Sequence, residues 1–519
     1  MRILSITLFV ISEILVLARC KKILGIYSHP GKSHQVLGEV ILKKLAERGH
    51  NITMVSAYPL KTPVENYKDV FLDGFLEDIN ADGSIYLEME KHDLQNFMGT
   101  YELIRRFTNK TFAHPAMQSL IKSGDKFDLI VMDWFCKDAE LFYGNIFEAP
   151  IILTSSFGTQ NELNYLINNP EPYSYVPASG FAYTDEMGFL DRLGNTLAVL
   201  FVEAFLFRNE IQQQMILDRY FDNAPRIWEL RRNIDLIFTN AHPTFETPRP
   251  YLPNIIPIGG VHVQEPQLLP LNIQEFLDSA QNGAVYFSLG SHMKTSELPE
   301  DILYNIVRAF SKVQQKVLLK WEKDEKPKLP LNVMVGKWMP QNSILAHPNV
   351  KVFITHGGLM SKIEAIHYAT PMIGIPVFGD QKTNVIHSVQ EGIAVQLSLS
   401  ELSEKALVSA INEIINNSSY SRNIQKKSNL LRDQPMVPID TAIYWAEFVM
   451  RHNGSKHLQN KSMRLNKFQN LLLDVALTLI GVLVLIVFIF RKVFVFALKL
   501  PISATVIRTR TRKIKLKEN

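Results

Sequence analysis

Short apolar runs alternate with amphipathic stretches along most of the chain. In the first half, apolar runs of strand length occur at residues 23–28, 52–56, 128–132, 151–154 and 235–240. Between the first two runs, residues 34–48 show apolar positions at helical spacing, and Gly49 ends that stretch. Strands that are apolar throughout are typical of parallel sheets buried on both faces. The pattern therefore predicts an α/β domain that opens with a strand–helix–strand unit.

A second series of the same kind follows a proline-rich segment. Seven prolines lie between residues 243 and 270, and proline cannot continue a helix or a central strand. Beyond them, apolar runs return at 284–289, 317–321, 333–335, 352–355 and 372–375. We predict two Rossmann-like, doubly wound domains, residues 21–245 and 276–450, joined by a linker at 246–275. A cleft is expected where the carboxyl ends of the two sheets face each other.

Both ends of the chain carry apolar segments of another kind. Residues 1–20 begin with Arg2 and continue through an apolar stretch to small residues, a pattern typical of a signal peptide cleaved after Cys20, although Glu13 interrupts it. Residues 471–490 are apolar except for Asp474. As a helix they would span about 30 Å, the thickness of a bilayer's hydrocarbon core. We predict a transmembrane helix there, preceded by a juxtamembrane segment at 451–470.

Charge is concentrated in the tail at 491–519. The whole chain has 55 basic and 51 acidic residues, a net charge of +4. The tail has nine basic residues and one acid, 9 − 1 = +8, so the rest carries 4 − 8 = −4. This distribution gives no basis for nucleic-acid binding. Because positively charged residues that flank a membrane span stay in the cytosol, we expect the tail in the cytosol and residues 21–470 in the lumen.

Short motifs fit a lumenal body and the endoplasmic reticulum. Lys515 and Lys517 near the carboxyl terminus resemble a dilysine retrieval signal, although lysines there could also serve attraction to a membrane surface. Glycosylation sequons begin at Asn51, Asn109, Asn416 and Asn453. Only two cysteines occur, and cleavage after Cys20 would leave Cys136 alone, which excludes an internal disulfide. We predict a single-pass type I membrane glycoprotein.

The second half contains an ordered set of residues suited to a nucleotide sugar. The strand at 352–355 leads into His356-Gly357-Gly358, and a helix follows. Glycines let the backbone approach a ligand, and the N–H groups and dipole at a helix start favour phosphate. Ser361 and Glu364 share one face of that helix, and Trp338 offers a flat surface for a base. Each residue alone fits ordinary packing, but their joint order favours a binding site.

This ordered segment resembles the signature of the UDP-glycosyltransferase family. The matching residues are Trp338-Met339-Pro340-Gln341, Phe353 to Ser361, Glu364 and Asp380-Gln381, while Phe287-Ser288-Leu289-Gly290-Ser291 is similar to the family's second donor loop. Similarity of layout covers nearly the whole chain and is greatest to the membrane-bound animal branch, which includes the UDP-glucuronosyltransferases. Leu359-Met360-Ser361 resembles the insect members. The resemblance implies a GT-B fold whose second domain binds the UDP-sugar.

The resemblance also implies a role for each matching residue. The implied contacts are Trp338 to uracil; Gln341 and Glu364 to ribose; Ser291, His356, Gly358 and Ser361 to the diphosphate; and Asp380 and Gln381 to the sugar hydroxyls. Met360 stands where many relatives have an asparagine that touches phosphate. That contact must therefore be absent or supplied elsewhere.

In the first half, His34 is the candidate catalytic base. It lies sixteen residues before His50, the spacing by which the family's catalytic histidine is recognised, and His29 is its rival. A neutral histidine can take the acceptor's proton as its oxygen attacks the anomeric carbon. Asp133, after the strand at 128–132, resembles the family's partner carboxylate, and Asp138 is the nearest competitor. Sequence spacing alone does not show that His34 and Asp133 meet.

The expected reaction is one in-line displacement that inverts the sugar, with UDP leaving toward the helix dipole and His356. No Asp-x-Asp pair occurs in the chain, which disfavours glycosyltransferases that hold the diphosphate through a divalent ion. We expect neither a metal nor a cofactor, because the UDP-sugar is a co-substrate. UDP-glucose is favoured as donor by the insect-like resemblance, and UDP-glucuronate is the alternative.

The acceptor is less defined. Residues 58–112 and 161–221 are rich in apolar and aromatic residues, which predicts a small lipophilic alcohol, phenol, steroid or pigment, although these residues could equally be core. Such conjugation serves detoxification or hormone and pigment metabolism. Acceptor identity and self-association stay open.

Two other functions compete with glycosyl transfer, that of a kinase or NTPase and that of a membrane receptor or binding protein. Gly31-Lys32-Ser33 fails as a phosphate-binding loop because five residues, not four, separate Gly25 from Gly31. A non-catalytic membrane binding protein that keeps the fold is the remaining alternative.

Overall fold

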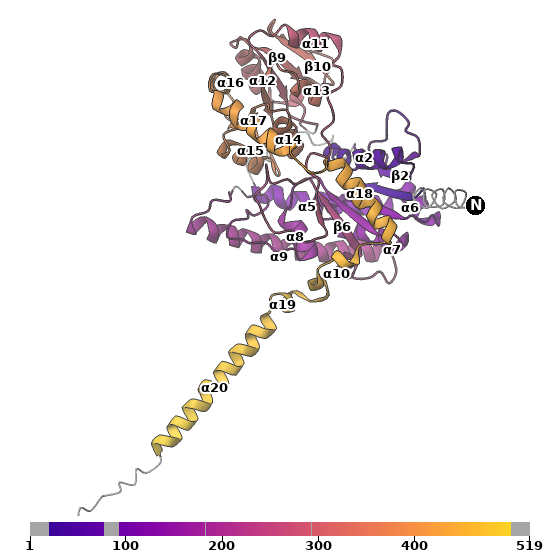
Figure 1. Cartoon of the computed structure of the whole chain (residues 1–519), viewed down its shortest axis with the longest axis vertical. Coiled ribbons are helices and arrows are strands. Elements are labelled where there is room, and N and C mark those ends of the chain that lie inside the picture. Colours follow the sequence, from indigo (N-terminus) through magenta and orange to yellow (C-terminus); the bar gives the residue numbers. More distant parts are fainter. Residues whose placement is uncertain (1–19, 77–92, 182, 292, 500–519) are drawn as a thin grey trace, which may run out of the picture. The chain divides into compact units, whose positions relative to one another are not determined.

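Two parallel β-sheets, each flanked by helices, form two lobes (Figure 1). The computed structural model describes residues 20–76, 93–181, 183–291 and 293–499. It divides into two compact units at Asn460, and both lobes belong to the first unit. Apart from Cys20, the predicted signal peptide lies outside the described residues, as does the predicted retrieval signal.

The first lobe contains a seven-stranded sheet in the order β3-β2-β1-β4-β5-β6-β7. Its strands are β1 (Lys22–Tyr27), β2 (Asn51–Ser56), β3 (Tyr67–Phe71), β4 (Leu129–Asp133), β5 (Ile151–Ser155), β6 (Ile234–Thr239) and β7 (Ile255–Pro257). Its helices are α2 (Lys32–Glu47), α5 (Asp93–Ala113), α6 (Pro115–Lys122), η1 (Asp138–Phe142), α7 (Tyr143–Ile146), α8 (Asn161–Ile167), α9 (Phe189–Tyr220), α10 (Ile227–Leu230) and η2 (Arg231–Asn233). All described neighbouring strands pair in parallel.

The second lobe contains a six-stranded parallel sheet in the order β10-β9-β8-β11-β12-β13. Its strands are β8 (Ala284–Ser288), β9 (Lys316–Lys320), β10 (Val333–Gly336), β11 (Val350–Thr355), β12 (Met372–Gly374) and β13 (Ala394–Gln396). Its helices are α11 (Leu271–Asp278), η3 (Thr295–Glu297), α12 (Glu300–Phe310), α13 (Gln341–Leu345), α14 (Leu359–His367), α15 (Gln381–Gln390), α16 (Glu404–Asn416) and α17 (Ser418–Arg432).

Apolar strands produced these sheets as predicted. Along β8, Val285 and Phe287 pack into one core cluster, whereas Ala284 and Tyr286 pack into another on the opposite face. Successive side chains point to opposite faces, so a strand buried on both must be apolar at every position. The prediction of two doubly wound lobes is confirmed. The prolines of the linker also leave room for a short edge strand, β7, which joins the first sheet and ends at Pro257.

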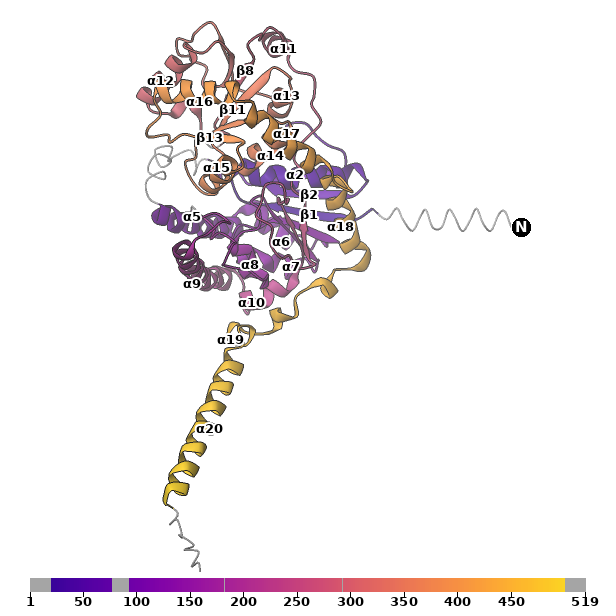
Figure 2. The ribbon, with the colours of Figure 1, turned by 60° about the vertical axis from the view of Figure 1, so that its left-hand side comes forward.

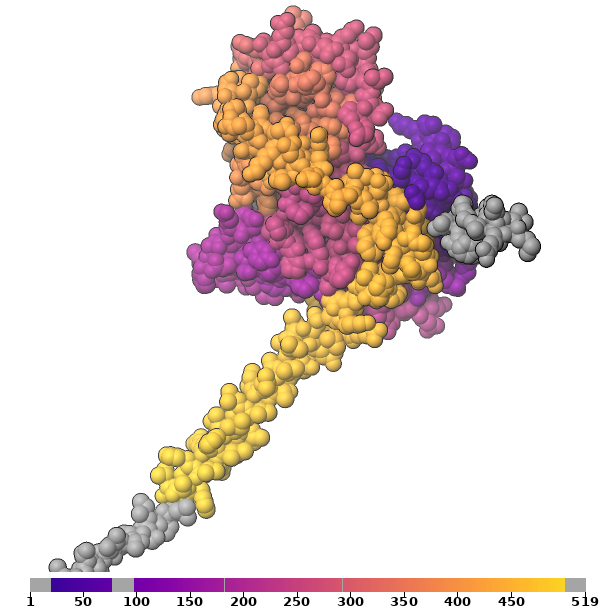
Figure 3. Space-filling model, viewed as in Figure 1, coloured from indigo at the N-terminus to yellow at the C-terminus, as the bar shows by residue number. Residues whose placement is uncertain are grey.

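The helix α18 (Pro438–His452) returns to the first lobe. Its Ala442, Ala446 and Val449 are buried in one cluster with Ile23 and Leu129 of the first sheet. Figures 2 and 3 show α18 along that lobe. The predicted boundaries assigned residues up to 450 to the second domain. The apolar face of α18 instead completes the core of the first lobe, where α2 packs against it.

The second unit contains one long apolar helix. Its elements are η5 (Lys461–Arg464), α19 (Lys467–Asn470) and α20 (Leu473–Lys499), and η4 (Lys456–Leu458) precedes the boundary. By length and composition, α20 qualifies as a membrane span. The helix extends beyond the predicted end at residue 490, through Arg491 and Lys492, to Lys499.

Candidate functional site

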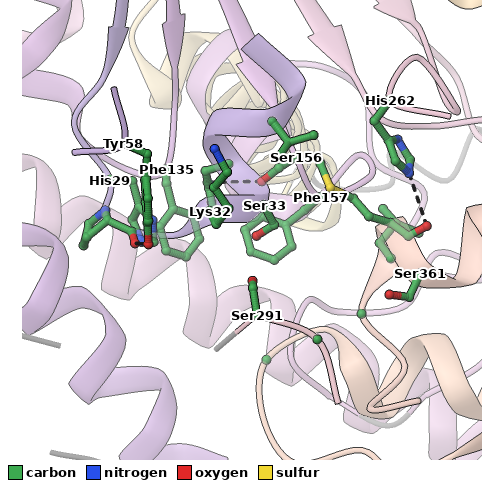
Figure 4. A pocket seen from close by; sticks show the side chains of 18 of the residues that line it. His29, Lys32, Ser33, Tyr58, Phe135, Ser156, Phe157, His262, Ser291 and Ser361 are labelled. Atoms are coloured by element: carbon green, nitrogen blue, oxygen red, sulfur yellow. Dashed lines mark hydrogen bonds between the residues drawn. The ribbon is translucent and has the colours of Figure 1, made fainter. Parts of the chain in front are cut away.

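A cavity of about 1260 Å³ lies between the carboxyl ends of the two sheets and takes its walls from both lobes. Parallel doubly wound sheets place their binding crevice where the strand order reverses, here between β1 and β4 and between β8 and β11. In Figure 4, Ser33 and Ser156 of the first lobe face the side of the cavity that carries Ser291 of the second. All predicted site residues except Asp133 line this cavity.

His34 and Asp133 meet directly, although 99 positions separate them. Because β1 and β4 are neighbours in the sheet, the first turn of α2 lies beside the end of β4. The Nδ1 atom of His34 is 3.0 Å from Oδ1 of Asp133, and both side chains are buried. A carboxylate only accepts, so the ring donates its Nδ1–H to it. The tautomer that results carries its lone pair on Nε2.

Ser156, which sequence reasoning missed, also contacts the His34 ring. Its Oγ atom lies 3.1 Å from Nδ1. With one hydrogen on that nitrogen, Asp133 and Ser156 can share it as a three-centre bond. Ser156 directly follows β5, which neighbours β4 in the sheet. Its position as a polar residue just after an apolar strand was the feature of the sequence that could have identified it as a site residue.

Aromatic rings fix the plane of His34. Ring centroids lie 4.1 Å away for His29, 5.1 Å for Phe135 and 5.2 Å for Phe157. His29, the rival base, accepts the N–H of Gly31 at its own Nδ1 with a distance of 2.9 Å. This packing leaves the imidazole of His34 little rotational freedom.

Asp138, the rival carboxylate, has other partners. It accepts from Nε1 of Trp134 at 2.9 Å and pairs with Arg231 at 2.8 Å. The structure therefore brings Asp133, and not Asp138, to His34.

A buried ion pair supports the loop below His34. Nζ of Lys137 lies 3.2 Å from Glu140, and both contact the hydroxyl of Ser28 at the end of β1. Burial raises the pKa of Glu140 despite the lysine. The pair joins the strand that leads to His34 to the segment that follows β4, so it braces both partners of the histidine–aspartate contact.

On the opposite wall, His356 packs between two glycines. A Cβ atom at Gly290 would lie 2.5 Å from Cε1 of this ring, and one at Gly358 would lie 2.6 Å from its Nε2. Such distances exclude any side chain. Gly358 is also the N-cap residue of α14, which begins at Leu359, so the glycines bring the imidazole and the helix start to one point of the cavity.

Gln341, Ser361 and Glu364 form a hydrogen-bonded group. The amide of Gln341 donates to the hydroxyl of Ser361 at 3.2 Å and to the carboxyl of Glu364, and its oxygen accepts from Tyr286. Burial raises the pKa of Glu364 to about 7. Trp338, in contrast, is 70% exposed at the cavity. The exposed ring of Trp338 can stack on a nucleotide base, and the ribose attached to that base could then reach the polar group of Gln341, Ser361 and Glu364.

Asp380 is the N-cap residue of α15 and Gln381 is its first residue, and the two side chains differ in their surroundings. Burial raises the pKa of Asp380, while Asn384 donates to it at 2.7 Å and the charge of His34 opposes the rise. Gln381 uses its side-chain oxygen to accept the N–H groups of Val377 and Phe378. Asp380 therefore faces the predicted base across the cavity, whereas the oxygen of Gln381 holds its own loop.

Two further residues of the donor side were not anticipated. Lys320, at the end of β9, donates to the carbonyl of Gly290, and burial lowers its pKa. His262 lies 3.2 Å from the carbonyl oxygen of Met360, which fixes the backbone at that position (Figure 4). The side chain of Met360 packs against the core cluster of the first lobe. A single lysine ending an apolar strand was a usable indication, but nothing in the sequence marked His262.

Apolar side chains line the part of the cavity beyond His34. They are Phe71, Leu76, Leu103, Ile104, Phe107, Phe135 and Phe157. Most belong to the first predicted acceptor segment, 58–112. Of the described residues in the second segment, 161–221, three line the cavity: Glu162, Ser179 and Gly180.

Comparisons with known proteins agree with this geometry. Residues 18–506 match the family model described as "UDP-glucoronosyl and UDP-glucosyl transferase". The chain is 36% identical to UDP-glucosyltransferase 2 of Dactylopius coccus over 91% of this chain and 92% of that one. It is 31% identical to human UDP-glucuronosyltransferase 2B10 over 84% and 86%.

A solved structure shares the fold. The UDP-glucosyltransferase from Polygonum tinctorium, solved in complex with 3,4-dichloroaniline, aligns with a TM-score of 0.57 at 14% identity, covering 83% of this chain and 99% of that one.

Proposed function

The chain belongs to the UDP-glycosyltransferase family, enzymes that transfer a sugar from a UDP-sugar, and we propose that it moves glucose from UDP-glucose to a hydroxyl of a small lipophilic acceptor with inversion at the anomeric carbon. The observation that carries the proposal is the 3.0 Å contact between His34 and Asp133 in the cavity that also holds the donor residues.

In the proposed step, Nε2 of His34 removes the acceptor's hydroxyl proton. The oxygen attacks the anomeric carbon as the bond from that carbon to the UDP oxygen breaks on the opposite side, so the sugar inverts. Asp133 accepts the Nδ1–H throughout and stabilises the imidazolium, as the aspartate does in hydrolase triads.

The charge that develops on UDP would be met by protein groups. The N-terminus of α14, the imidazole of His356 and the ammonium of Lys320 all border the same part of the cavity. Such oriented donors stabilise a developing oxyanion without reorganising. We therefore propose a metal-independent reaction, for which an excess of EDTA should leave the transfer rate unchanged; restoration of lost activity by Mg²⁺ or Mn²⁺ would contradict it.

Glucose is the proposed sugar because the Dactylopius coccus relative is named a glucosyltransferase. The buried carboxyl of Asp380 near His34 supports this choice, since an added carboxylate on the sugar would meet a like charge. A donor panel of UDP-glucose, UDP-glucuronate and UDP-galactose with one phenol tests it: faster transfer from UDP-glucuronate would refute glucose as the donor.

The chemical class of the acceptor is inferred from the side chains that line the cavity near His34. Apolar and aromatic side chains surround the position from which a hydroxyl would reach His34, and such walls select flat or compact lipophilic molecules. We propose phenols, steroids or pigments of this kind as substrates.

The decisive experiment compares His34→Ala with His29→Ala. The first variant should lose transfer by at least about 10²-fold and still bind UDP, because the donor residues lie in the other lobe. The second keeps the base and should retain most activity. Loss of UDP binding along with activity in His34→Ala would show that the histidine is structural.

We further propose that α20 spans the endoplasmic reticulum membrane with the first unit in the lumen. Asn416 is exposed at the end of α16 and begins a sequon. Expressed in insect or mammalian cells, the chain should lose mass on treatment with peptide N-glycosidase, and less in the Asn416→Gln variant. A chain unmodified at every sequon would argue for a cytosolic body.

A further inference from the structure

A pair of hydrogen-bonded polar side chains lies in the apolar wall on the acceptor side of the cavity. Tyr101 of α5 and Glu162 of α8 both line the cavity, and the phenol hydroxyl of Tyr101 donates to Oε1 of Glu162 at 3.1 Å. Tyr101 is 3% exposed and Glu162 is 8% exposed, so both side chains are buried at this wall. Neither residue has a part in the proposed reaction.

The pair lies at the end of a row of residues that begins near the proposed base. Tyr101, Ile104 and Phe107 are spaced three apart, so they share one face of α5, and all three line the cavity. The ring of Phe107 lies 6.3 Å from the ring of His29, which packs against His34. Phe107 and Tyr101 are six residues apart on the helix, which corresponds to about 9 Å. An acceptor that places its hydroxyl at His34 can therefore reach the pair with an aromatic ring and a short substituent.

The segment after β5 connects the same two places. Ser156 contacts Nδ1 of His34, and Phe157 packs against the ring (Figure 4). Gln160 and Glu162 follow along the cavity wall. Two separate elements, α5 and this segment, thus lead from the proposed base to the carboxyl of Glu162.

The carboxyl of Glu162 lacks a partner for one of its oxygens. Oε2 is buried and makes no hydrogen bond within the described structure. Burial raises the pKa of Glu162, although the neighbouring hydroxyls of Tyr101 and Ser179 oppose the rise. Glu39, another carboxyl at the cavity, pairs with Lys32 and Lys43, whereas no basic side chain among the described residues pairs with Glu162. A buried carboxyl oxygen without a donor costs free energy, which a ligand that donates to it would recover.

A purely structural role would not require this placement. Glu162 lies in the first turn of α8, where a negative charge stabilises the helix dipole. An exposed carboxylate would serve that purpose equally well, and without the cost of burial. The position of Glu162 at the cavity wall therefore points to a ligand.

We propose that Glu162 binds a second polar group of the acceptor, a hydroxyl or an ammonium that donates a hydrogen bond to its carboxyl, while the reacting hydroxyl lies at His34. Tyr101 positions the carboxyl. This inference rests on the proposed function and narrows its acceptors to lipophilic phenols that carry a hydrogen-bond donor at the far end.

The test measures transfer from UDP-glucose by the full chain to three phenols of one shape. They are p-ethylphenol, tyrosol and tyramine, which end in a methyl group, a hydroxyl and an ammonium. The variants are Glu162→Leu, which removes both carboxyl oxygens, and Glu162→Gln, which keeps the shape and the contact with Tyr101. Glu171→Gln is the matched control, because this nearby carboxyl accepts from Asn161 and Asn164 and does not line the cavity.

The informative quantity is the kcat/KM of each polar phenol divided by that of p-ethylphenol, since this ratio cancels effects common to all acceptors. Glu162→Leu should lower the tyrosol ratio about fivefold, the effect of one lost hydrogen bond, and the tyramine ratio at least about tenfold, because charge-assisted bonds are stronger. Glu162→Gln should lower mainly the tyramine ratio. Glu171→Gln should leave both ratios at their wild-type values.

Unchanged ratios in both Glu162 variants would overturn the inference, as would an equal drop in Glu171→Gln. Transfer to p-ethylphenol alone reports on the proposed reaction. If none of the phenols were glucosylated, calorimetric titration with the same three compounds in the presence of UDP would give the corresponding ratios of affinity. The two proposals can therefore fail separately.

Discussion

The single Nδ1 hydrogen of His34 has two acceptors, the carboxylate of Asp133 and the hydroxyl of Ser156. The carboxylate carries the charge that stabilises an imidazolium, so Asp133 dominates energetically. Ser156 fixes the orientation of the His34 ring, because its hydroxyl contacts Nδ1 from the end of the neighbouring strand β5. We therefore regard Ser156 as a positioning residue of the proposed reaction.

Ser156→Ala should lower kcat about fivefold, the equivalent of about 1 kcal/mol for one hydrogen bond. KM for UDP-glucose should stay unchanged, because the residues proposed to bind the donor lie in the second lobe. Ser155→Ala is the control: that hydroxyl bonds only to backbone carbonyls of the following turn in the described structure. Steady-state kinetics of both variants measure the difference. An equal loss of kcat in the two would mean that the serine-to-alanine change acts through general packing.

Glu364 gives the donor site a pH dependence. Its pKa is raised to about 7 by burial, so the carboxyl becomes ionised between pH 6 and 8. In the proposed site the ionised carboxylate would accept two hydrogen bonds from ribose hydroxyls, so this form should bind UDP-glucose more tightly. UDP-glucose affinity should therefore rise about tenfold from pH 6 to pH 8.

Calorimetric titration with UDP-glucose measures this, because its diphosphate has no group that titrates in that range. Glu364→Gln should flatten the pH dependence. An unchanged slope in this variant would assign the effect to another group, and protonation of a histidine would act in the opposite direction by strengthening binding at low pH.

At the scale of elements, the donor loop after β8 depends on Gly290. Its φ is +88°, and a Cβ there would overlap His356. Gly290→Ala should displace the imidazole and raise KM for UDP-glucose at least about tenfold, since small misplacements at a binding site are costly.

Gly124→Ala is the matched control for that variant. Its φ is +73°, but no atom lies within 4 Å of the added carbon. Backbone strain is therefore common to both variants and only the clash differs. Similar kinetics in the two would show that His356 does not depend on the glycine.

At the scale of the whole molecule, α18 connects the end of the second lobe to the core of the first. Ala446 is fully buried in that core, whereas Tyr444 on the same helix is 47% exposed. Ala446→Asp places an unpaired charge in the core and should reduce the free energy of unfolding by about 3 to 5 kcal/mol.

Tyr444→Asp should be close to neutral by comparison. Thermal unfolding of the two variants, followed by circular dichroism, measures the difference. Equal melting temperatures would mean that α18 is not an integral part of the first lobe.

Local pattern alone was sufficient for the two parallel sheets, the positions of their main strands and the apolar helix near the end, because these segments are uninterrupted runs of apolar residues. It was insufficient for β3, β7 and β13, which are short edge strands with weak patterns. It also misplaced α18, whose amphipathic sequence does not say which lobe it covers.

For the site, the ordered motif from Trp338 to Gln381 identified one wall of the cavity from sequence, because its residues lie close together along the chain. Only the tertiary structure brought Asp133 to His34 and added Ser156 to the same nitrogen. Contacts between residues far apart in sequence depend on strand order and helix packing, which a local pattern of apolar and polar residues does not encode.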